Sequence, residues 1–140
     1  MNMISNPEVT TETIRTDVRI IIAGTRTFDN YSLLRKKTDA FIEKYYSNRD
    51  IIIVSGGASG ADSLGEKYAK ERGFKLKRFP ANWSKYGKMA GMIRNRLMAE
   101  YSNALVAFWD NVSPGTKNMI KLARDHHLEI KIVIYEEGDW

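Results

Sequence analysis

Short apolar runs alternate along this chain with longer segments in which apolar residues recur every three or four positions. The runs are rich in Val, Ile and Leu and end at glycines or polar residues, as is typical of buried strands. The third run is the least apolar, because two basic residues interrupt it. We therefore predict five strands, at residues 18–23, 51–54, 76–79, 104–109 and 130–135.

Four helices are predicted between these strands from the spacing of their apolar residues. They span Tyr31–Tyr46, residues 61–73, residues 89–101 and residues 114–127. A loop through Trp83 and Tyr86 precedes the third helix, whose spacing places Met89, Ile93, Leu97 and Tyr101 on one apolar face.

Strands that alternate with helices predict a parallel sheet whose crossover connections cover both of its faces. The fold class is therefore α/β, with one Rossmann-like, three-layer domain around a five-stranded, mostly parallel sheet. With the strand order 3-2-1-4-5, residues 18–23 are central, and residues 51–54 and 104–109 flank them. Such sheets bind ligands beyond the carboxyl ends of their strands, so the loops after these three strands should form the site.

Composition narrows the class of protein further. The first 17 of the 140 residues show no periodicity and contain four threonines and Pro7, which predicts a flexible tail over residues 1–17 and one domain over residues 18–140. The absence of cysteine excludes disulfides, thiolate metal sites and a cysteine nucleophile. We expect no metal and no cofactor. We also expect no membrane partner, since no apolar run could cross a bilayer and the N-terminus lacks a signal-peptide pattern. The expected location is the cytoplasm.

Positive charge is concentrated in one part of the chain. Residues 70–98 contain nine Lys or Arg and one acid, a sum of +8 against +5 for the whole chain. Such a block fits an anionic partner, either a phosphate-bearing small molecule or nucleic acid. A solvated lysine-rich face would explain the lysines equally well, but not the arginines 94 and 96 within an apolar pattern.

All three loops carry glycines where a phosphate could approach the backbone, and the first two are the most distinctive. The first reads Gly24, Thr25, Arg26, in which the glycine permits close approach and the arginine offers a planar fork for an anion. The second, residues 55–62, contains three glycines before a helix, whose amino end attracts anions. It is neither a Walker A loop nor a dinucleotide fingerprint. A capping box between Ser59 and Asp62 is the structural alternative.

The third helix and the fourth strand add further candidates. Gly91, Arg94, Asn95 and Met98 share a helix face, where a ligand phosphate or Asp62 could pair with the arginine. After the fourth strand comes the segment Trp109-Asp-Asn-Val-Ser-Pro-Gly-Thr116. There Ser113 and Pro114 fit the N-cap and first positions of a helix, Gly115 and Thr116 could bind a second anion, and Trp109 could stack on a base.

Four ordered motifs together resemble the YspA-type branch of the SLOG superfamily. They are Gly-Thr-Arg at 24–26, Ser-Gly-Gly-Ala-Ser-Gly-Ala-Asp at 55–62, the Trp-to-Met stretch at 83–98, and Phe-Trp-Asp-Asn-Val-Ser-Pro-Gly-Thr at 108–116. The resemblance runs from about residue 19 to residue 134. It implies a Rossmann-like nucleotide-ligand domain, as in the lysine-decarboxylase-like LOG phosphoribohydrolases, the DNA-processing protein DprA and sensors of NAD-derived nucleotides.

The resemblance also bears on catalysis. The hydrolase branch carries a Pro-Gly-Gly-x-Gly-Thr-x-x-Glu motif with a catalytic glutamate, and counting from Gly115 and Thr116 places Met119 at that position. We therefore expect no hydrolysis by that mechanism, and Asp62 is the remaining candidate acid or base. The predicted ligand-binding residues are Gly24, Thr25, Arg26, Ser55, Gly56, Gly57, Ala58, Gly60, Asp62, Arg94, Asn95, Trp109, Ser113, Pro114, Gly115 and Thr116.

The sequence therefore favours a module that binds or senses a nucleotide or a derivative such as ADP-ribose or an NAD-like compound. The alternative is a hydrolase that cleaves an N-glycosidic or phosphoribosyl bond of such a ligand. A third function, DprA-like binding of single-stranded nucleic acid, would use residues 70–98, with Trp83 and Tyr86 as stacking surfaces. The expected partner is a nucleotide-like small molecule, with nucleic acid and a second copy of the chain as the other candidates.

Overall fold

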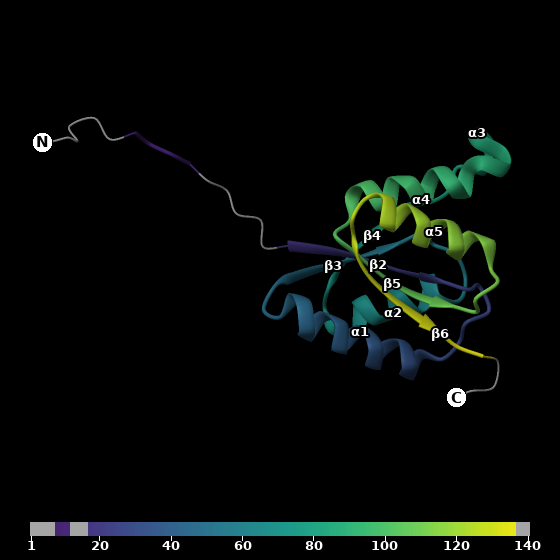
Figure 1. Ribbon diagram of the computed structural model, residues 1–140, viewed down its shortest axis with the longest axis horizontal. Coiled ribbons are helices and arrows are strands. Elements are labelled where there is room, and N and C mark those ends of the chain that lie inside the picture. The colour runs from purple at the N-terminus through teal and green to yellow at the C-terminus, as the bar shows by residue number, and fades with distance from the viewer. Residues whose placement is uncertain (1–7, 12–16, 137–140) are drawn as a thin grey trace, which may run out of the picture.

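A computed structural model describes residues 8–11 and 17–136 of the chain (Figure 1). Strands and helices alternate along its whole length from residue 17. In order, the elements are β2 (Asp17–Gly24), α1 (Tyr31–Tyr46), β3 (Asp50–Ser55), α2 (Ala61–Arg72), β4 (Lys75–Arg78), α3 (Trp83–Tyr86), the 3-10 turn η1 (Gly87–Met89), α4 (Ala90–Tyr101), β5 (Ala104–Trp109), α5 (Pro114–Asp125) and β6 (Glu129–Ile134).

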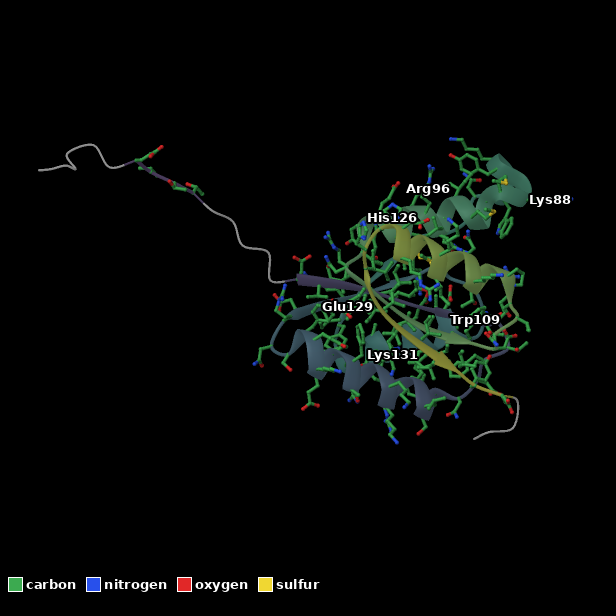
Figure 2. The ribbon with its side chains drawn as sticks, viewed as in Figure 1. Lys88, Arg96, Trp109, His126, Glu129 and Lys131 are labelled. Carbon is green, nitrogen blue, oxygen red and sulfur yellow. The ribbon has the colours of Figure 1, made fainter. Side chains whose placement is uncertain are left out.

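The five strands form one parallel sheet in the order β4-β3-β2-β5-β6, which confirms the predicted fold class and strand order. The central strand β2 pairs with both of its neighbours, so that Ile20 lies opposite Ile53 on β3 and Ala104 on β5. In Figure 2, Trp109 marks the carboxyl end of β5 and Glu129 the opposite end of the sheet, at the start of β6. The loops after β2, β3 and β5 therefore meet at one edge.

Two hydrophobic cores lie on the two faces of the sheet, because successive strand side chains point to opposite sides. Helices α1 and α2 cover one face, where Ile20 and Ile22 of β2 pack with Leu34 and Tyr68. Helices α4 and α5 cover the other face, where Ile21 lies in a cluster with helical methionines and alanines. Burial on both faces explains why the central strands read as continuous apolar runs rather than as alternating ones.

The elements differ from the predicted ones mainly at their ends. Strand β4 begins one residue earlier than expected, at Lys75, and α5 ends at Asp125 rather than at residue 127. The loop expected through Trp83 and Tyr86 is a short helix, because the Asn82 side chain caps it by accepting a hydrogen bond from the Lys85 amide. The tail predicted over residues 1–17 lies mostly outside the described residues, and Asp17 already belongs to β2.

Helix α4 buries a different face from the apolar stripe of its sequence. Met89 and Leu97 are 52% and 43% exposed, while Ala90, Met98 and Ala99 are buried against the sheet and α5. The apolar face predicted from the spacing is thus partly exposed, because the face with small residues and Met98 is the one that packs closely. Among the helices of residues 17–136, none combines the length and hydrophobicity that a membrane span requires.

Candidate functional site

A cavity of about 460 Å³ lies at the carboxyl edge of the sheet, between β2, α2, α4 and α5. Gly24 and Gly115 both line it, which confirms that the loops after β2 and β5 converge. Its walls comprise Ala23, Gly24, Thr25, Arg26, Thr27, Ala58, Asp62, Arg94, Asn95, Met98, Asp110, Ser113, Pro114, Gly115, Thr116 and Met119. A cavity of this size at this position of an α/β sheet is typical of a small-molecule site.

Thr25 joins three of the segments that surround the cavity. Its amide donates to the Phe108 carbonyl at 3.0 Å, and its own carbonyl accepts from the Ala61 amide at 3.3 Å. Its hydroxyl accepts a hydrogen bond from the Asp110 amide at 3.1 Å. The backbone of Thr25 therefore ties the start of α2 and the end of β5 to the end of the central strand, and its buried side chain adds the loop after β5.

The glycine loop after β3 meets α2 without the predicted capping box. Gly60 is the N-cap at a φ of 74°, and no side chain caps the helix. A Cβ at Gly60 would collide with the carbonyl groups of Thr25 and Arg26, so this close approach requires glycine. The Ser59 hydroxyl instead donates to the Arg26 carbonyl at 3.2 Å, which corrects the capping-box prediction. Contact between the loop after β2 and the loop after β3 therefore determines how α2 begins.

Asp62 projects from the first turn of α2 into the cavity. It is only 6% exposed, and its Oδ2 accepts a hydrogen bond from the Ala58 amide at 3.3 Å. Burial raises the pKa of Asp62 to about 6, although the Ala58 amide and the positive charge of Arg94 act in the opposite direction. A carboxyl group with this pKa is present in both its protonated and its ionised form near neutral pH.

Arg94 reaches from α4 to the glycine loop. Its Nη1 donates to the Gly56 carbonyl, and its Nε donates to the Asn95 side chain at 3.0 Å. Burial lowers the pKa of Arg94, and the charge of Asp62 partly offsets this effect. Arg94 thus has protein partners of its own and also faces the cavity.

Asn95 and Asp110 hold the part of the site that α5 contributes. The Asn95 amide donates to the Asn118 side chain at 2.9 Å, which links α4 to α5. Asp110 accepts hydrogen bonds from the Val112 amide at 3.0 Å and from the Ser113 amide at 2.8 Å. Burial raises the pKa of Asp110, but these hydrogen bonds outweigh it and lower the pKa below its usual value. Ser113 and Pro114 occupy the predicted N-cap and first helical positions.

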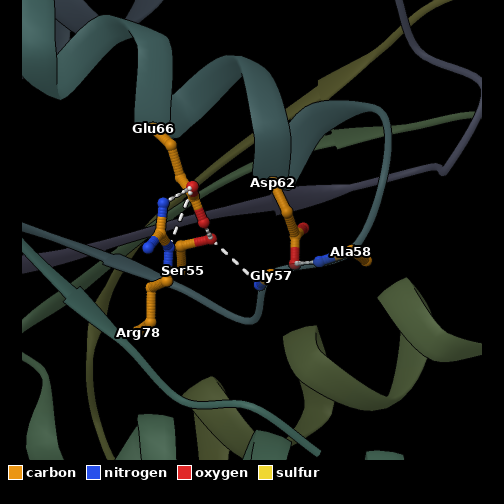
Figure 3. A network of polar contacts seen from close by, with 6 residues as sticks. All are labelled: Ser55, Gly57, Ala58, Asp62, Glu66 and Arg78. Atoms are coloured by element: carbon orange, nitrogen blue, oxygen red, sulfur yellow. Dashed lines mark hydrogen bonds and ion pairs between the residues drawn. The ribbon is translucent and has the colours of Figure 1, made fainter.

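A second polar network, built on Ser55, Glu66 and Arg78, supports the glycine loop (Figure 3). The buried Ser55 hydroxyl donates to Glu66 at 2.7 Å and accepts from the Gly57 amide at 3.0 Å. Glu66 in turn accepts from the Arg78 guanidinium at 2.6 Å. Hydrogen bonds from Arg78 lower the pKa of Glu66 despite its partial burial. The network fixes one end of the loop to α2 and to the edge strand β4.

A second cavity, of about 480 Å³, adjoins the first on the side of α3. The two cavities share Arg26, Ala58 and Arg94. The remaining walls of the second cavity are Gly56, Gly57, Ser59, Pro80, Ala81 and Trp83.

Most of the predicted site residues lie around these two cavities. Eleven of the sixteen line the first cavity, and Gly56 and Gly57 line the second. The other three lie in neither wall. Ser55 is buried beneath the loop, Gly60 packs on the backbone of the first loop, and the Trp109 indole donates to the Ser113 carbonyl at 3.1 Å.

Several cavity residues were not predicted. Asp110 could have been found, because an Asp three residues before a Ser-Pro helix start is typical of a turn whose side chain binds backbone amides. Met98 and Met119 form part of the apolar wall, and their spacing alone does not distinguish a cavity wall from core. Met119, the residue at the glutamate position of the hydrolase motif, does face the cavity.

Comparison with known proteins relates part of this chain to a known family. Residues 18–86 match the model of the YspA, cpYpsA-related SLOG family. The Gene 61 protein of Mycobacterium phage D29 is 27% identical over 113 residues, which cover 76% of this chain and 88% of that protein.

The structure of this chain is similar to those of DNA processing protein A from two bacteria. For that of Streptococcus pneumoniae the TM-score is 0.63 at 14% identity, over 88% of this chain and 52% of that one. For that of Helicobacter pylori, described for its single-stranded DNA binding mode, the TM-score is 0.64 at 19% identity, over 88% and 68%. The chain thus spans about half of the pneumococcal protein, and the likeness concerns the fold. The match of residues 18–86 thus bears out the resemblance of the chain to the YspA, cpYpsA-related SLOG family.

Proposed function

We propose that the first cavity binds a nucleotide or a nucleotide-derived small molecule. The observation that carries this proposal is the convergence on one cavity of three loops and of the two arginines Arg26 and Arg94. An arginine presents a planar fork of N–H donors that matches phosphate geometry. The volume of about 460 Å³ suits one nucleoside unit with its phosphate.

Each wall of the cavity has a part in this proposal. Arg26 and Arg94 would bind the phosphate together with the first-turn amides of α5, which have no partner within a helix. Asp62 would accept hydrogen bonds from the ribose hydroxyls, the usual partners of a carboxylate beside a nucleotide. Met98 and Met119 supply an apolar wall against which a base can pack.

Titration calorimetry and thermal unfolding of the full chain with AMP, ADP-ribose, NAD and inorganic phosphate test this function. A ligand at 100 times its Kd should raise the free energy of unfolding by about 2.7 kcal/mol and therefore raise the Tm. If none of these compounds gives heat or a Tm shift, the cavity does not bind this class of ligand.

Asp62 supports a second candidate, hydrolysis of the N-glycosidic bond of the same ligand. Its carboxyl group lines the cavity, and its pKa of about 6 suits a general acid or base near neutral pH. Met119 cannot take the glutamate's part in this reaction. Chromatography would establish the hydrolase if the wild type releases free base at about 1 per second or faster and the Asp62→Asn variant releases none. Intact ligand after long incubation would exclude it.

Single-stranded nucleic acid offers the same phosphate and base chemistry. The Helicobacter protein of similar fold binds single-stranded DNA, and residues 70–98 of this chain carry a net charge of +8. Lys88 and Arg96 extend this charge over the outer side of the α3 and α4 layer (Figure 2). Binding to an oligonucleotide that weakens steeply with salt would favour this function over a small ligand.

A further inference from the structure

The second cavity is lined in part by residues that follow β4 and do not line the first cavity. Its lining includes the backbone of Gly56 and Gly57 and the small residue Ala58. The lining also includes Pro80, Ala81 and Trp83, whose side chains are apolar apart from the indole N–H. The nucleotide bound in the first cavity would leave this space empty, so the site has room for a second group.

Trp83 is held in place although it is 54% exposed. It begins α3, and the Asn82 side chain caps that helix through the Lys85 amide at 3.1 Å and the Ser84 hydroxyl at 3.0 Å. A Cβ added at Gly91 would lie 3.6 Å from Cη2 of Trp83, so the ring lies beside the α4 backbone at a residue without a side chain. A large aromatic ring fixed and exposed at a cavity wall is suited to stacking on another planar ring.

The boundary between the two cavities is positively charged. Arg26 and Arg94 line both cavities, and the charge of Arg26 lowers the pKa of Arg94, so the two guanidinium groups repel each other. Within residues 8–11 and 17–136, the Arg26 guanidinium makes neither a hydrogen bond nor an ion pair, so it is available to a ligand. Two like charges at this boundary favour a linker with more than one negative charge.

We propose that the second cavity is a subsite for a planar heterocycle, and that the ligand is two nucleoside-like units joined through a diphosphate. One unit occupies each cavity, the diphosphate lies between Arg26 and Arg94, and the second ring stacks on Trp83. This inference rests on the proposed function, because the first unit occupies the nucleotide cavity. Two cavities of about 460 and 480 Å³ that share a cationic boundary match two units of similar size.

Titration calorimetry with AMP, ADP-ribose, NAD and diadenosine diphosphate tests the subsite on the full chain. NAD and diadenosine diphosphate should bind about tenfold more tightly than AMP, and ADP-ribose, which lacks the second ring, should fall between them. Trp83→Ala should abolish this tenfold advantage and leave AMP affinity unchanged, and Trp83→Phe should keep part of it. Tyr86→Ala is the matched control, since Tyr86 is an exposed aromatic of α3 that lines neither cavity.

Each other outcome separates the two proposals. AMP binding without any gain for the two-ring ligands, or a gain that survives Trp83→Ala, overturns the second subsite and leaves the nucleotide cavity intact. Absence of binding by all four compounds overturns the proposed function as well. A single-stranded oligonucleotide that binds more tightly than the dinucleotides, and that loses affinity equally in Trp83→Ala and Tyr86→Ala, would replace the dinucleotide by a strand laid over α3.

Discussion

Arg94 and Asp62 both lie so close to Gly56 that neither leaves room for a side chain there. A Cβ at residue 56 would lie 2.6 Å from Nη1 of Arg94 and 2.9 Å from Oδ2 of Asp62. The two charged groups come from α4 and α2, and a glycine at residue 56 lets both approach the loop after β3. The position of the cationic and the anionic group in the cavity therefore depends on one absent methyl group.

We expect Gly56→Ala to displace Arg94 and to lower the free energy of unfolding by about 1–3 kcal/mol, the usual cost of overpacking. Gly115→Ala is the control, because a Cβ there meets nothing within 4 Å. Gly115 lies in α5, where alanine is the better helix former, so this variant should be as stable as the wild type or more so. Urea unfolding of both variants checks the prediction, which equal losses would contradict.

Arg94→Ala should weaken both the fold and the ligand complex. Its hydrogen bond to the Gly56 carbonyl is charge-assisted, so its removal should lower the free energy of unfolding by about 1.5–3 kcal/mol. If Arg94 also binds phosphate, affinity for AMP should fall about tenfold to a hundredfold. Arg96→Ala, an exposed arginine two residues further along α4, should leave both quantities nearly unchanged. Lost stability with unchanged affinity would leave Arg94 with a structural role alone.

The stability of the protein should depend on pH through Asp62. Its pKa of about 6 in the folded protein exceeds the value of 3.8 expected for an unfolded chain. Between these values the folded protein holds more protons, so this group's contribution to the free energy of unfolding decreases as the pH rises from about 4 to 6. The decrease amounts to roughly 3 kcal/mol.

Asp62→Asn removes this titration and keeps the shape of the side chain. The two proteins should have similar stability near pH 4, and the variant should be the more stable one above pH 6. Denaturant unfolding at pH 4, 5, 6 and 7 measures the difference. Two curves that run parallel across this range would show that burial does not perturb Asp62.

The contribution of Glu66 to the free energy of unfolding should depend on pH in the opposite sense to that of Asp62, and Glu66→Gln should remove it. The pKa of Glu66 is lowered, first by its hydrogen bonds from Arg78, so its ionised form stabilises the protein above the ordinary pKa of 4.5. The stabilisation is lost as the pH falls below that value. Because Arg78 is 62% exposed, we expect a loss of only about 1 kcal/mol at pH 7.

Asp125→Asn provides the control for Glu66→Gln. It breaks the exposed pair with Lys121, one turn apart on α5, and should cost less than about 0.5 kcal/mol. Glu66→Gln should also weaken binding of AMP, since Ser55, which accepts the hydrogen bond of the Gly57 amide, loses its charged partner, whereas Asp125→Asn should not. Equal effects of both variants on AMP affinity would contradict a supporting role for Glu66.

The strand order was predictable because the chemically distinctive loops follow only three of the strands, and one order brings those loops together. The convergence of those loops on one cavity was predictable for the same reason. The exposure of Met89 and Leu97 was not predictable, since their periodicity is as regular as that of the face that packs on α5. Close packing of the small residues of α4 determines which face is buried, and this packing depends on the neighbouring helix α5.

The partners of Ser59 and the second cavity depend on contacts between segments far apart in the sequence. Ser59 has the spacing of a capping residue, yet its hydroxyl bonds Arg26, a residue 33 positions earlier. Trp83 reaches the site because the turn after β4 runs beside the glycine loop. Residue types within one segment carry no information on such distances.

The hydrogen bonds of Thr25 have a thermodynamic consequence for recognition. Its amide, carbonyl and hydroxyl bind groups from β5, α2 and the loop after β5, so these segments are ordered before any ligand arrives. The conformational entropy of ordering them is lost during folding rather than during association. A ligand should therefore meet a pre-organised receptor, associate without a slow conformational step, and leave the backbone of these segments within about 1 Å of its free position.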